Sequence, residues 1–327
     1  MSRGRGVLFT VEEREKFREL MAACRGVTVL SHIHPDADAI GTSLGIYHLL
    51  KEEGVRVEVA NATAEMPRHL DFLEGFEKIK KKIDFEDSLI IACDCGSLDR
   101  LGFDVTGRTI VNIDHHPSNT GYGTLNLVRA HAVSSSEVAF RFFAPFYRIS
   151  RSVARAFYAA LISDTRYFTT GNVTAESFEL ARELIGLGAE PGAIAQAMLQ
   201  RRSLASLRVL GRALESLRLY HNAQVAVMTV GREDILATGA RYDDLDGIVD
   251  YARSLVTVEL AILVVERQES LKVSLRSKGV DVLELAEAFG GGGHREAAGF
   301  ETTQYTPERL VSLLLNMIQD KGVIPLP

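Results

Sequence analysis

The chain has 327 residues, of which 46% are hydrophobic and 24% charged, and its formal net charge is −6. This is the composition of a globular protein large enough for two ordinary domains. No run approaches the roughly 20 apolar residues that a membrane-spanning helix needs. Affinity for long nucleic acids depends mainly on a basic surface, so the acidic balance favours a short polyanion bound at a local site.

The cysteines and the start of the chain bear on its location. Cys24, Cys93 and Cys95 are too few, and odd in number, for a disulfide framework. The first residues carry Arg3 and Arg5 with no apolar segment behind them, which is not the pattern of a signal peptide. We therefore expect a cytoplasmic protein that does not enter the membrane.

Short β-rich runs alternate with helical patterns in the first half of the chain. A helix is predicted over Ala39–Glu53, where Gly54 is a typical residue to follow the last turn. The alternation predicts an α/β domain with a mainly parallel sheet flanked by helices. The predicted strands are Val27–Ser31, Val55–Ala60, Leu89–Cys93 and Thr109–Ile113.

The second half of the chain begins with helices and continues with longer strands. Ser134 and Glu137 have the spacing of a capping box. Ala175–Leu187 is also helical, and linking helices are predicted within Ala193–Leu217. We expect residues 1–187 to form the first domain, 188–216 a helical linker and 217–327 a smaller α+β domain. The strands predicted for this last domain are Gln224–Val230, Glu259–Glu266 and Ser270–Arg276.

Carboxylate and imidazole side chains follow the predicted strands of the first domain. Alone, each has an ordinary explanation, since an aspartate after a strand is usually a turn residue or a helix cap. We assign His34 and His48 to such ordinary roles. The others come at the carboxyl ends of separate segments, where ligand sites of open parallel sheets form. They lie in His32-Ile33-His34-Pro35-Asp36-Ala37-Asp38, at Asp94, in Asp114-His115-His116-Pro117, and at Asp164 after the apolar run Ala156–Ser163.

Such a cluster predicts bound cations. Several carboxylates within a few ångströms repel one another, and divalent cations remove that cost. A mixture of carboxylate oxygen and imidazole nitrogen suits Mn²⁺ better than Mg²⁺. A zinc–cysteine site is not expected, because Cys93 and Cys95 lack the usual spacing and a second pair.

These residues resemble a known family. His32-x-x-x-Asp36-x-Asp38, Asp94, Asp114-His115-His116 and Asp164 are similar to the successive motifs of the DHH phosphoesterase superfamily. Ser270–Arg276 and the segment Gly290-Gly291-Gly292-Gly293-His294-Arg295-Glu296-Ala297-Ala298-Gly299 resemble the DHHA1 substrate-binding domain. Order, spacing and length, from about Val27 to the C-terminal helix, are similar to the nanoRNase and pAp-phosphatase branch. The resemblance implies a DHH domain with the DHHA1 domain across a cleft from it.

The resemblance also implies roles for the clustered residues. It implies two manganese ions per site, with Mg²⁺ or Co²⁺ as substitutes, which activate water and neutralise charge on the phosphate. Asp94, Asp114 and His116 are assigned to catalysis; Asp114 would orient a ligand, and His116 would lie near the scissile phosphate or support the cluster. The implied ligands are His32, Asp36 and Asp94 for one ion, and Asp38, Asp94, His115 and Asp164 for the other, so that Asp94 bridges the two.

Substrate recognition is assigned to the second domain. Glycines let a backbone approach an anion closely, and a guanidinium can grip a phosphate with two donors. For Arg253, a solvent-exposed helix face is almost as good an explanation. The candidate substrate-binding residues are Arg253, Arg276, Gly291, Gly292, Gly293, His294 and Arg295.

The chain departs from many relatives at one place. After the last aspartate of the motifs they have Thr-Gly, whereas this chain has Thr165 followed by Arg166-Tyr167-Phe168. A bulky cation beside the expected metals would contact the substrate or narrow the site.

The expected function is hydrolysis of short RNA oligonucleotides and dinucleotides to mononucleotides, with removal of the 3′-phosphate of pAp. The alternative substrates are cyclic dinucleotides of the c-di-AMP type. A processive RecJ-type exonuclease would need further nucleic-acid-binding domains, and a type II pyrophosphatase carries a different second domain. An alternative from another class of protein is a non-catalytic nucleotide sensor or RNA-binding module. The intact set of metal ligands counts against this alternative. Cleavage polarity and oligomeric state, a homodimer included, stay open.

Overall fold

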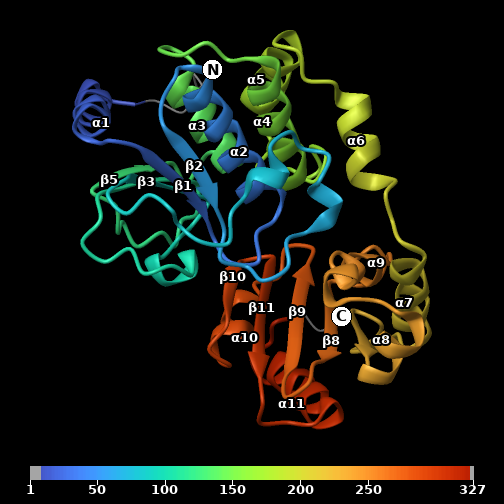
Figure 1. Ribbon diagram of the computed structural model, residues 1–327. Coiled ribbons are helices and arrows are strands. Elements are labelled where there is room, and N and C mark those ends of the chain that lie inside the picture. The colour runs from blue at the N-terminus through green and yellow to red at the C-terminus, as the bar shows by residue number, and fades with distance from the viewer. Residues whose placement is uncertain (1–8, 325–327) are drawn as a thin grey trace, which may run out of the picture. The chain divides into compact units, whose positions relative to one another are not determined.

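The computed structural model describes residues 9–324, and the chain divides between Arg201 and Arg202 into two compact units (Figure 1). The division falls inside the segment 188–216, where a helical linker is expected. Arg3 and Arg5, on which the signal-peptide argument rests, lie outside the described residues. Within the described range, no helix is long and apolar enough to cross a membrane.

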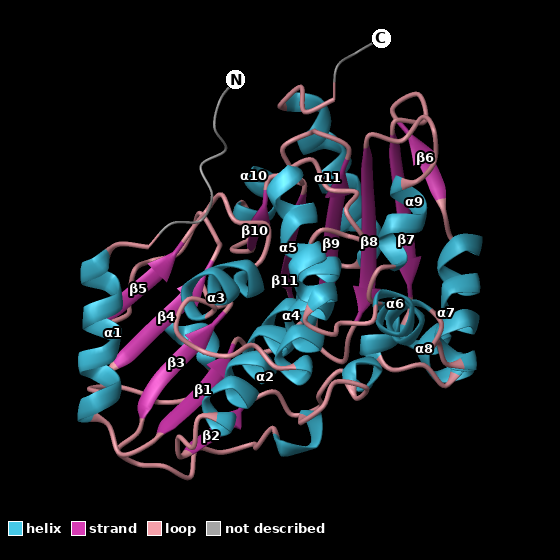
Figure 2. Ribbon diagram, turned by 90° about the horizontal axis from the view of Figure 1, so that it is seen from above, coloured by secondary structure: helices cyan, strands magenta, loops and turns pink. Residues whose placement is uncertain are grey.

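The first unit is built on a five-stranded parallel sheet in the order β2-β1-β3-β4-β5 (Figure 2). The direction of strand order reverses between β1 and β3, which makes their carboxyl ends the topological switch point, the usual ligand position in such sheets. Strands β1, β3 and β4 are buried throughout, as expected for a parallel sheet that is covered on both faces. The strands are β1 (Val27–Ser31), β2 (Val57–Ala60), β3 (Leu89–Cys93), β4 (Ile110–Asp114) and β5 (Leu125–Val128).

The predicted α/β class is confirmed, with small shifts at strand ends. β1 and β3 have the predicted bounds, whereas β2 begins at Val57 instead of Val55. β4 is displaced by one residue, so that Asp114 ends the strand instead of following it.

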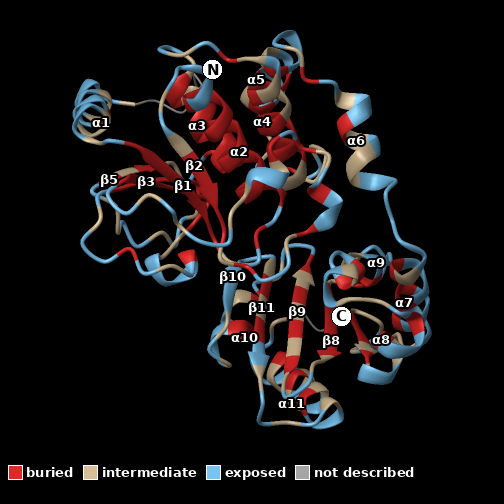
Figure 3. Cartoon of the chain, in the orientation of Figure 1, coloured by how far each residue is buried: buried red, intermediate tan, exposed pale blue. Residues whose placement is uncertain are grey.

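Helices pack mainly on one face of this sheet, around the largest hydrophobic core (Figure 3). A smaller apolar cluster on the other face joins strand residues such as Leu30 and Ile90 to Leu101 and Val105 in the segment between β3 and β4. The α-helices of this unit are α1 (Val11–Ala23), α2 (Ala37–Glu52), α3 (Ser135–Phe143), α4 (Arg151–Asp164), α5 (Ala175–Gly186) and α6 (Pro191–Leu199). Short 3₁₀ helices are η1 (Arg68–Leu70), η2 (Phe76–Lys78) and η3 (Leu98–Leu101).

Two glycines allow α2 and α4 to pack very closely. A Cβ added at Gly41 would lie 2.6 Å from the carbonyl oxygen of Ala156, and one at Gly45 would lie 2.2 Å from the ring of Phe157. Along α2, Asp38 lies near Asp164, Gly41 near Ala160 and Gly45 near Phe157, so the two helices run antiparallel. The first turn of α2 and the last turn of α4 therefore meet at the same edge of the unit.

The second unit contains a six-stranded sheet in the order β10-β11-β9-β8-β7-β6, in which β7 and β8 pair parallel and the other neighbours pair antiparallel. One face packs on α10 (Leu283–Glu287) and α11 (Pro307–Asp320). On the other face, α7 (Leu204–Glu215), α8 (Arg232–Thr238), η4 (Tyr242–Leu245) and α9 (Ile248–Arg253) pack against β7 and β8. The strands are β6 (Arg218–Tyr220), β7 (Val225–Val230), β8 (Leu260–Glu266), β9 (Leu271–Ser277), β10 (Gly292–His294) and β11 (Ala297–Thr302).

The helices predicted within Ala193–Leu217 do not form one continuous linker. α6 packs against α4 and η1 of the first unit, whereas α7 packs against β7 and α8 of the second. The chain passes from the first unit to the second within the segment 200–203, which lies between these helices.

We predict that Gly41→Ala destabilises the protein by about 1–3 kcal/mol, the usual cost of overpacking a core. The added methyl group would meet backbone and the Ala160 Cβ at 2.9 Å, neither of which can rotate away. Gly211→Ala is the matched control, because Gly211 lies inside α7 with nothing within 4 Å of the added Cβ. There, alanine should stabilise the helix by up to about 1 kcal/mol. Urea denaturation measures both, and an undiminished stability of Gly41→Ala would contradict the packing argument.

Candidate metal centre

The ends of three strands and two helices bring the predicted carboxylates and imidazoles together. Asp36 caps the N-terminus of α2 and Asp38 lies in its first turn. Asp164 is the last residue of α4. Asp94 directly follows β3, with a left-handed φ of 54°, and Asp114 ends β4. The ordinary capping role of Asp36 and its place in the cluster are therefore compatible.

Asp94 lies at the centre of this cluster and is 2% exposed. Its Oδ2 is 3.5 Å from Nε2 of His32. Its Oδ1 is 3.7 Å from Nε2 of His115 and 3.6 Å from Nδ1 of His116. The two oxygens of one carboxylate thus face different imidazoles.

Among the described residues, three groups have the geometry to hold a cation. In each, one potential ligand atom per residue lies within 4.8 Å of the others. Asp94 belongs to two of the groups. The third group contains His115, whose Nε2 lies 3.7 Å from Oδ1 of Asp94. The groups are His32, Asp36 and Asp94; Asp38, His115 and Asp164; and Asp94, His115 and His116. All six residues expected from the sequence as metal ligands are brought together.

The buried carboxylates act strongly on one another. Burial and the charge of Asp94 raise the pKa of Asp38 to about 7. Burial and the charges of Asp38 and Asp36 raise the pKa of Asp164 well above its usual range. Asp94 differs: burial opposes its ionisation, but the hydrogen bond from His32 and the charges of the histidines outweigh burial and lower its pKa. The ionised form of Asp94 is therefore favoured, in contrast to Asp38 and Asp164.

The imidazoles respond to the same carboxylates. Burial lowers the pKa of a histidine, but in each of the three the neighbouring carboxylates more than compensate, and the pKa is raised. The residues are His32, His115 and His116. The cluster thus attracts positive charge, whether as protons or as metal ions.

The N-terminus of α3 supplies part of this positive charge. The backbone N–H of Ser135 donates to Oδ2 of Asp38 at 2.6 Å, and that of Ser136 donates to Oδ1 at 3.2 Å. The Ser135 hydroxyl donates to Oδ1 of Asp94 at 2.9 Å. A helix N-terminus stabilises negative charge. The spacing of Ser134 and Glu137 predicts a helix start here but does not indicate its contact with the cluster.

The capping box itself is only partly formed. Ser134 Oγ accepts from the N–H of Glu137 at 3.1 Å, as predicted. The Glu137 carboxylate accepts from the N–H of Val133 at 3.0 Å, one residue before the expected Ser134 donor.

Two other polar side chains hold the loops of the site. Asn61 Nδ2 donates at 2.9 Å to both the carbonyl oxygen of His32 and Oγ of Ser31. Asp114 Oδ1 accepts from Nδ1 of His116 at 2.7 Å and from the N–H of His115 at 2.8 Å. Asp114 is thus engaged in orienting the histidine pair. Asn61 was not identified from the sequence, because nothing in its neighbourhood marks a long-range hydrogen bond.

The two histidines given ordinary roles have hydrogen-bond partners in other segments of the first unit. The N–H of His34 donates to Oγ1 of Thr63 at 2.7 Å, and Nε2 of His48 contacts the carbonyl oxygen of Glu74 at 2.7 Å. Neither belongs to the candidate metal groups of the described residues.

The segment after Asp164 has a left-handed backbone without glycine. Arg166, Tyr167 and Phe168 have φ values of 44°, 58° and 63°. Such residues cost roughly 1 kcal/mol or more each. The segment is held because Tyr167 and Phe168 pack on the core and the Phe168 ring stacks on Phe178 at 4.8 Å. The chain therefore keeps the backbone that glycine favours while placing a cationic residue close to Asp164.

In the second unit, Arg276 and His294 share a row of the sheet. Arg276 on β9 pairs with Ala297 on β11, which pairs with His294 on β10. Directly paired residues point to the same face, so the two side chains flank a small residue. The next row on this face is Ser274, Gly299 and Gly292. These positions are partly or fully exposed, whereas β7 and β8 are covered on the same face by helices.

The glycine tract is part of a hairpin and not a loop. A Cβ at Gly291 would lie 2.3 Å from the carbonyl oxygen of Gly299, and one at Gly293 would lie 2.5 Å from that of Ala297. These glycines are needed for close pairing with β11. The N–H of Gly291 donates to the Ala286 carbonyl, while a Cβ at Gly292 would meet nothing within 4 Å.

Two of the expected arginines lie beside carboxylates. Arg253 Nε donates to Oδ1 of Asp250 at 2.9 Å within α9. Arg295, in the turn between β10 and β11, has Nε 3.8 Å from Oδ2 of Asp281.

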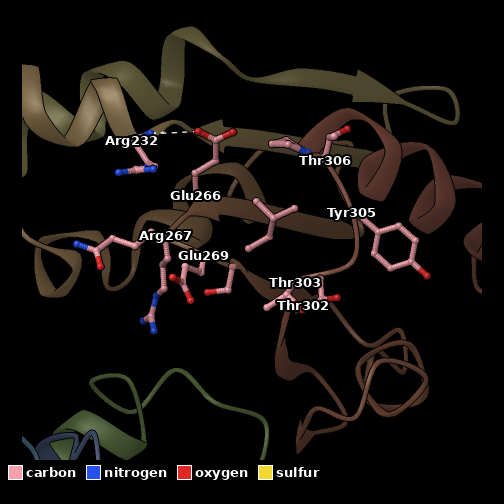
Figure 4. Close-up of a pocket in the computed structure, with 12 residues that line it drawn as sticks. Arg232, Glu266, Arg267, Glu269, Thr302, Thr303, Tyr305 and Thr306 are labelled. Carbon is pink, nitrogen blue, oxygen red and sulfur yellow. Dashed lines mark hydrogen bonds between the residues drawn. The ribbon is translucent and has the colours of Figure 1, made fainter.

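A pocket of about 380 Å³ lies at the opposite end of the second sheet (Figure 4). It opens where β9 begins at Leu271, whereas Arg276 stands near the end of that strand. Two of its charged side chains have partners: Arg267 is 3.2 Å from Glu301, and Glu266 accepts from the backbone N–H of Arg232 at 3.2 Å. No residue of this pocket was expected to function from the sequence.

The fold and the cluster together define an α/β protein with a candidate two-metal centre at the switch point of a parallel sheet. The chain belongs to the DHH family: the model of the DHH family N-terminal domain matches residues 26–162, and that of the DHHA1 domain matches residues 222–321.

Several proteins are similar over most of the chain. The bifunctional oligoribonuclease and PAP phosphatase NrnA of Thermus thermophilus is 30% identical over 87% of this chain and 88% of that protein. The protein of the same name from Bacillus subtilis is 24% identical over 82% of this chain and 86% of its own length. The cyclic-di-AMP phosphodiesterase PdeA of Listeria monocytogenes is 24% identical over 93% of this chain, but this covers 49% of PdeA.

Solved structures agree with this fold. An exopolyphosphatase-related protein from Bacteroides fragilis has a TM-score of 0.88 and 25% identity, and the match covers 97% of this chain and 98% of that one. RecJ from Thermus thermophilus has a TM-score of 0.57 and 17% identity, with 97% of this chain matching 55% of RecJ.

We predict that divalent metal binds more tightly at about pH 8 than at about pH 6. Asp38, whose pKa is raised to about 7, must lose its proton to become a ligand, and the histidines, whose pKa values are also raised, must become neutral. Calorimetric titration of the metal-stripped protein with Mn²⁺, in buffers of different ionisation enthalpy, should show proton release.

The same shift has a consequence for stability. The folded pKa of Asp38 lies above its usual value of 3.8, so this group loses its contribution to stability as the pH rises from about 4 to about 7. Mn²⁺ should therefore raise the melting temperature more at about pH 8 than at about pH 6. Equal affinity and equal thermal shifts at the two pH values would contradict this account.

Proposed function

We propose that this protein is a metal-dependent phosphoesterase that hydrolyses short oligoribonucleotides and dinucleotides to mononucleotides and removes the 3′-phosphate of pAp. The observation that carries the proposal is the convergence of carboxylates and imidazoles on buried Asp94. The relatives named as oligoribonuclease and PAP phosphatase support the same activity, since the alignment spans most of both chains.

The cluster has a suitable donor set for two cations. Oxygen and imidazole nitrogen together fit Mn²⁺, with Mg²⁺ or Co²⁺ as substitutes. Nδ1 of His32 lies 2.8 Å from the carbonyl oxygen of Ile33 and can donate to it, which leaves Nε2, the atom facing Asp94, to bind metal. The proposed ligands are His32, Asp36 and Asp94 for one ion and Asp38, Asp94, His115 and Asp164 for the other. When bound, such cations supply an activated water near neutral pH and positive charge against the phosphate.

His116 is the proposed proton donor to the leaving group. Its Nδ1–H donates to Asp114, so the ring is fixed and Nε2 lies on the side away from that carboxylate. Burial lowers the pKa of His116, but the hydrogen bond to Asp114 and the charge of Asp94 outweigh burial and raise it, which favours the doubly protonated ring. Cleavage of the P–O ester bond leaves an oxygen that takes this proton. Of the two roles that the sequence leaves open for His116, we favour the place near the scissile phosphate.

The open half of the second sheet is the proposed recognition surface. Arg276 can grip a terminal phosphate with two donors, and the small residues Ala297, Gly299 and Gly292 leave the backbone accessible beside it. His294 completes this row. Of the other expected residues, Gly291 and Gly293 serve the hairpin, and Arg253 and Arg295 lie beside carboxylates, so we give them supporting roles.

Cyclic dinucleotides of the c-di-AMP type are the second candidate substrates. PdeA aligns with 93% of this chain and is named as a cyclic-di-AMP phosphodiesterase. Because this chain spans about half of PdeA, we place linear substrates first. A non-catalytic nucleotide sensor would bind the same compounds without turnover.

We predict that the Mn²⁺-loaded protein hydrolyses pAp and the linear dinucleotides pApA and pGpG faster than longer RNA, cyclic dinucleotides or pyrophosphate. Asp94→Asn should lower kcat by about 1000-fold or more, because it disturbs both proposed cation sites. Product chromatography with all substrates side by side measures the order.

The matched control for this variant is Asp87→Asn. Asp87 is exposed and lies just before β3, at the opposite end of the strand that Asp94 follows. It should retain full activity. Tight nucleotide binding without turnover at saturating Mn²⁺ would favour the sensor, and preferential cleavage of pyrophosphate would favour a pyrophosphatase.

We predict that Arg276→Ala raises KM for phosphate-terminated dinucleotides about 10- to 100-fold, the loss of a charge-assisted hydrogen bond. Its metal content should not change, since Arg276 lies in the other unit from the cluster. Arg309→Ala is the control, because Arg309 is exposed on α11, against the opposite face of the same sheet. Steady-state kinetics measure KM, and elemental analysis measures the metal content. A loss of metal together with the rise in KM would mean that Arg276 has another role.

A further inference from the structure

Arg100 stands at the edge of the metal cluster, and no motif marks it. It lies in η3, between β3 and β4, and its side chain is exposed. One guanidinium nitrogen, NH2, is 3.3 Å from Nδ1 of His32, a residue that is 5% exposed. Arg100 therefore reaches from solvent to the back of an imidazole whose other nitrogen faces Asp94.

The backbone of Arg100 is fixed to this edge independently of its side chain. The N–H of Ile33 donates to the Arg100 carbonyl oxygen at 2.8 Å. Gly102, with φ 70°, approaches the same loop so closely that a Cβ would lie 2.5 Å from Cγ2 of Ile33. The position of the guanidinium thus follows from the packing of η3 on the loop after β1.

The guanidinium of Arg100 is not paired with a carboxylate within the part of the chain that the structure describes. No carboxylate there lies within 4.0 Å of it, whereas Arg129 and Arg141 each pair with a glutamate. Nδ1 of His32 already has the Ile33 carbonyl oxygen at 2.8 Å as an acceptor for its hydrogen. The ring orientation therefore has a cause other than Arg100, and most of the five N–H donors of the guanidinium stay available.

We propose that Arg100 is a substrate-binding residue that grips a non-bridging oxygen of the phosphate being hydrolysed. A planar guanidinium matches two phosphate oxygens and offsets the charge that develops on them in the transition state. This inference rests on the proposed function only in requiring that a phosphate occupies the cluster. It assigns phosphate contact to the catalytic unit, in addition to the recognition surface around Arg276.

The test compares Arg100→Gln and Arg100→Lys in the full-length, Mn²⁺-loaded protein. Inorganic phosphate is the probe, and its affinity is measured by calorimetry together with the affinity for Mn²⁺. Arg100→Gln should weaken phosphate binding about 10- to 100-fold, as for loss of a hydrogen bond to a charged group. Arg100→Lys, which keeps the charge without the fork, should recover part of the loss. Mn²⁺ affinity should stay within about twofold of wild type in both.

Arg25→Gln is the matched control. Arg25 is exposed and precedes β1, at the opposite end of the strand that leads into His32. It should bind phosphate and Mn²⁺ as the wild type does. With pAp as substrate, Arg100→Gln should lower kcat/KM about 100-fold, and Arg25→Gln should not.

Two results would overturn the inference. Phosphate affinity equal in Arg100→Gln and wild type would show that Arg100 does not contact the anion. A loss of Mn²⁺ affinity as large as the loss of phosphate affinity would show that Arg100 acts only through His32. The phosphate-binding measurement does not depend on turnover. If the wild type cleaved none of the esters, the proposed function would fail. Tighter phosphate binding by the wild type than by Arg100→Gln would still support the role of Arg100.

Discussion

The mutual repulsion of Asp38, Asp94 and Asp164 is the constraint on which the organisation of the first unit depends. Three carboxylates in one largely buried cluster cannot all be charged without compensation. Three histidines, the N-terminus of α3 and the Ser135 hydroxyl provide part of the compensating positive charge. The remainder appears as raised pKa values at Asp38 and Asp164. A site that holds protons in this way is prepared to exchange them for cations.

Close packing and local strain hold these groups in place. Gly41 and Gly45 bring α2 near enough to α4 for Asp38 and Asp164 to meet. Asp94 and the run Arg166–Phe168 adopt left-handed backbone conformations that favour glycine. Strain of this kind persists where the surrounding structure over-determines it, and it is commonly found at functional sites. The sheet and helix cores provide the free energy that keeps the repelling groups together.

The sequence predicted the fold class and the composition of the cluster because both depend on local pattern. Apolar runs mark β1 and β3, and the acids and histidines directly follow them, so the carboxyl edge of a parallel sheet could be located before any coordinates. The roles of Asn61, Ser135 and Arg100 depend on hydrogen bonds between segments far apart in sequence, which no spacing encodes. The glycine tract shows the same limit: only the pairing of β10 with β11 explains which glycines are required.

In the proposed function, the metal cluster engages the phosphate and has little means of distinguishing what is attached to it. Relatives with this motif set are named for different substrates, oligoribonucleotides and pAp for NrnA and cyclic-di-AMP for PdeA. Selection between such substrates must therefore come from groups beyond the cations. In the proposed function those groups would be the surface around Arg276 in one unit, and Arg100 and the segment beginning at Arg166 in the other. A short substrate makes few contacts with the protein. Each of these arginines would therefore contribute a large share of the discrimination between substrates.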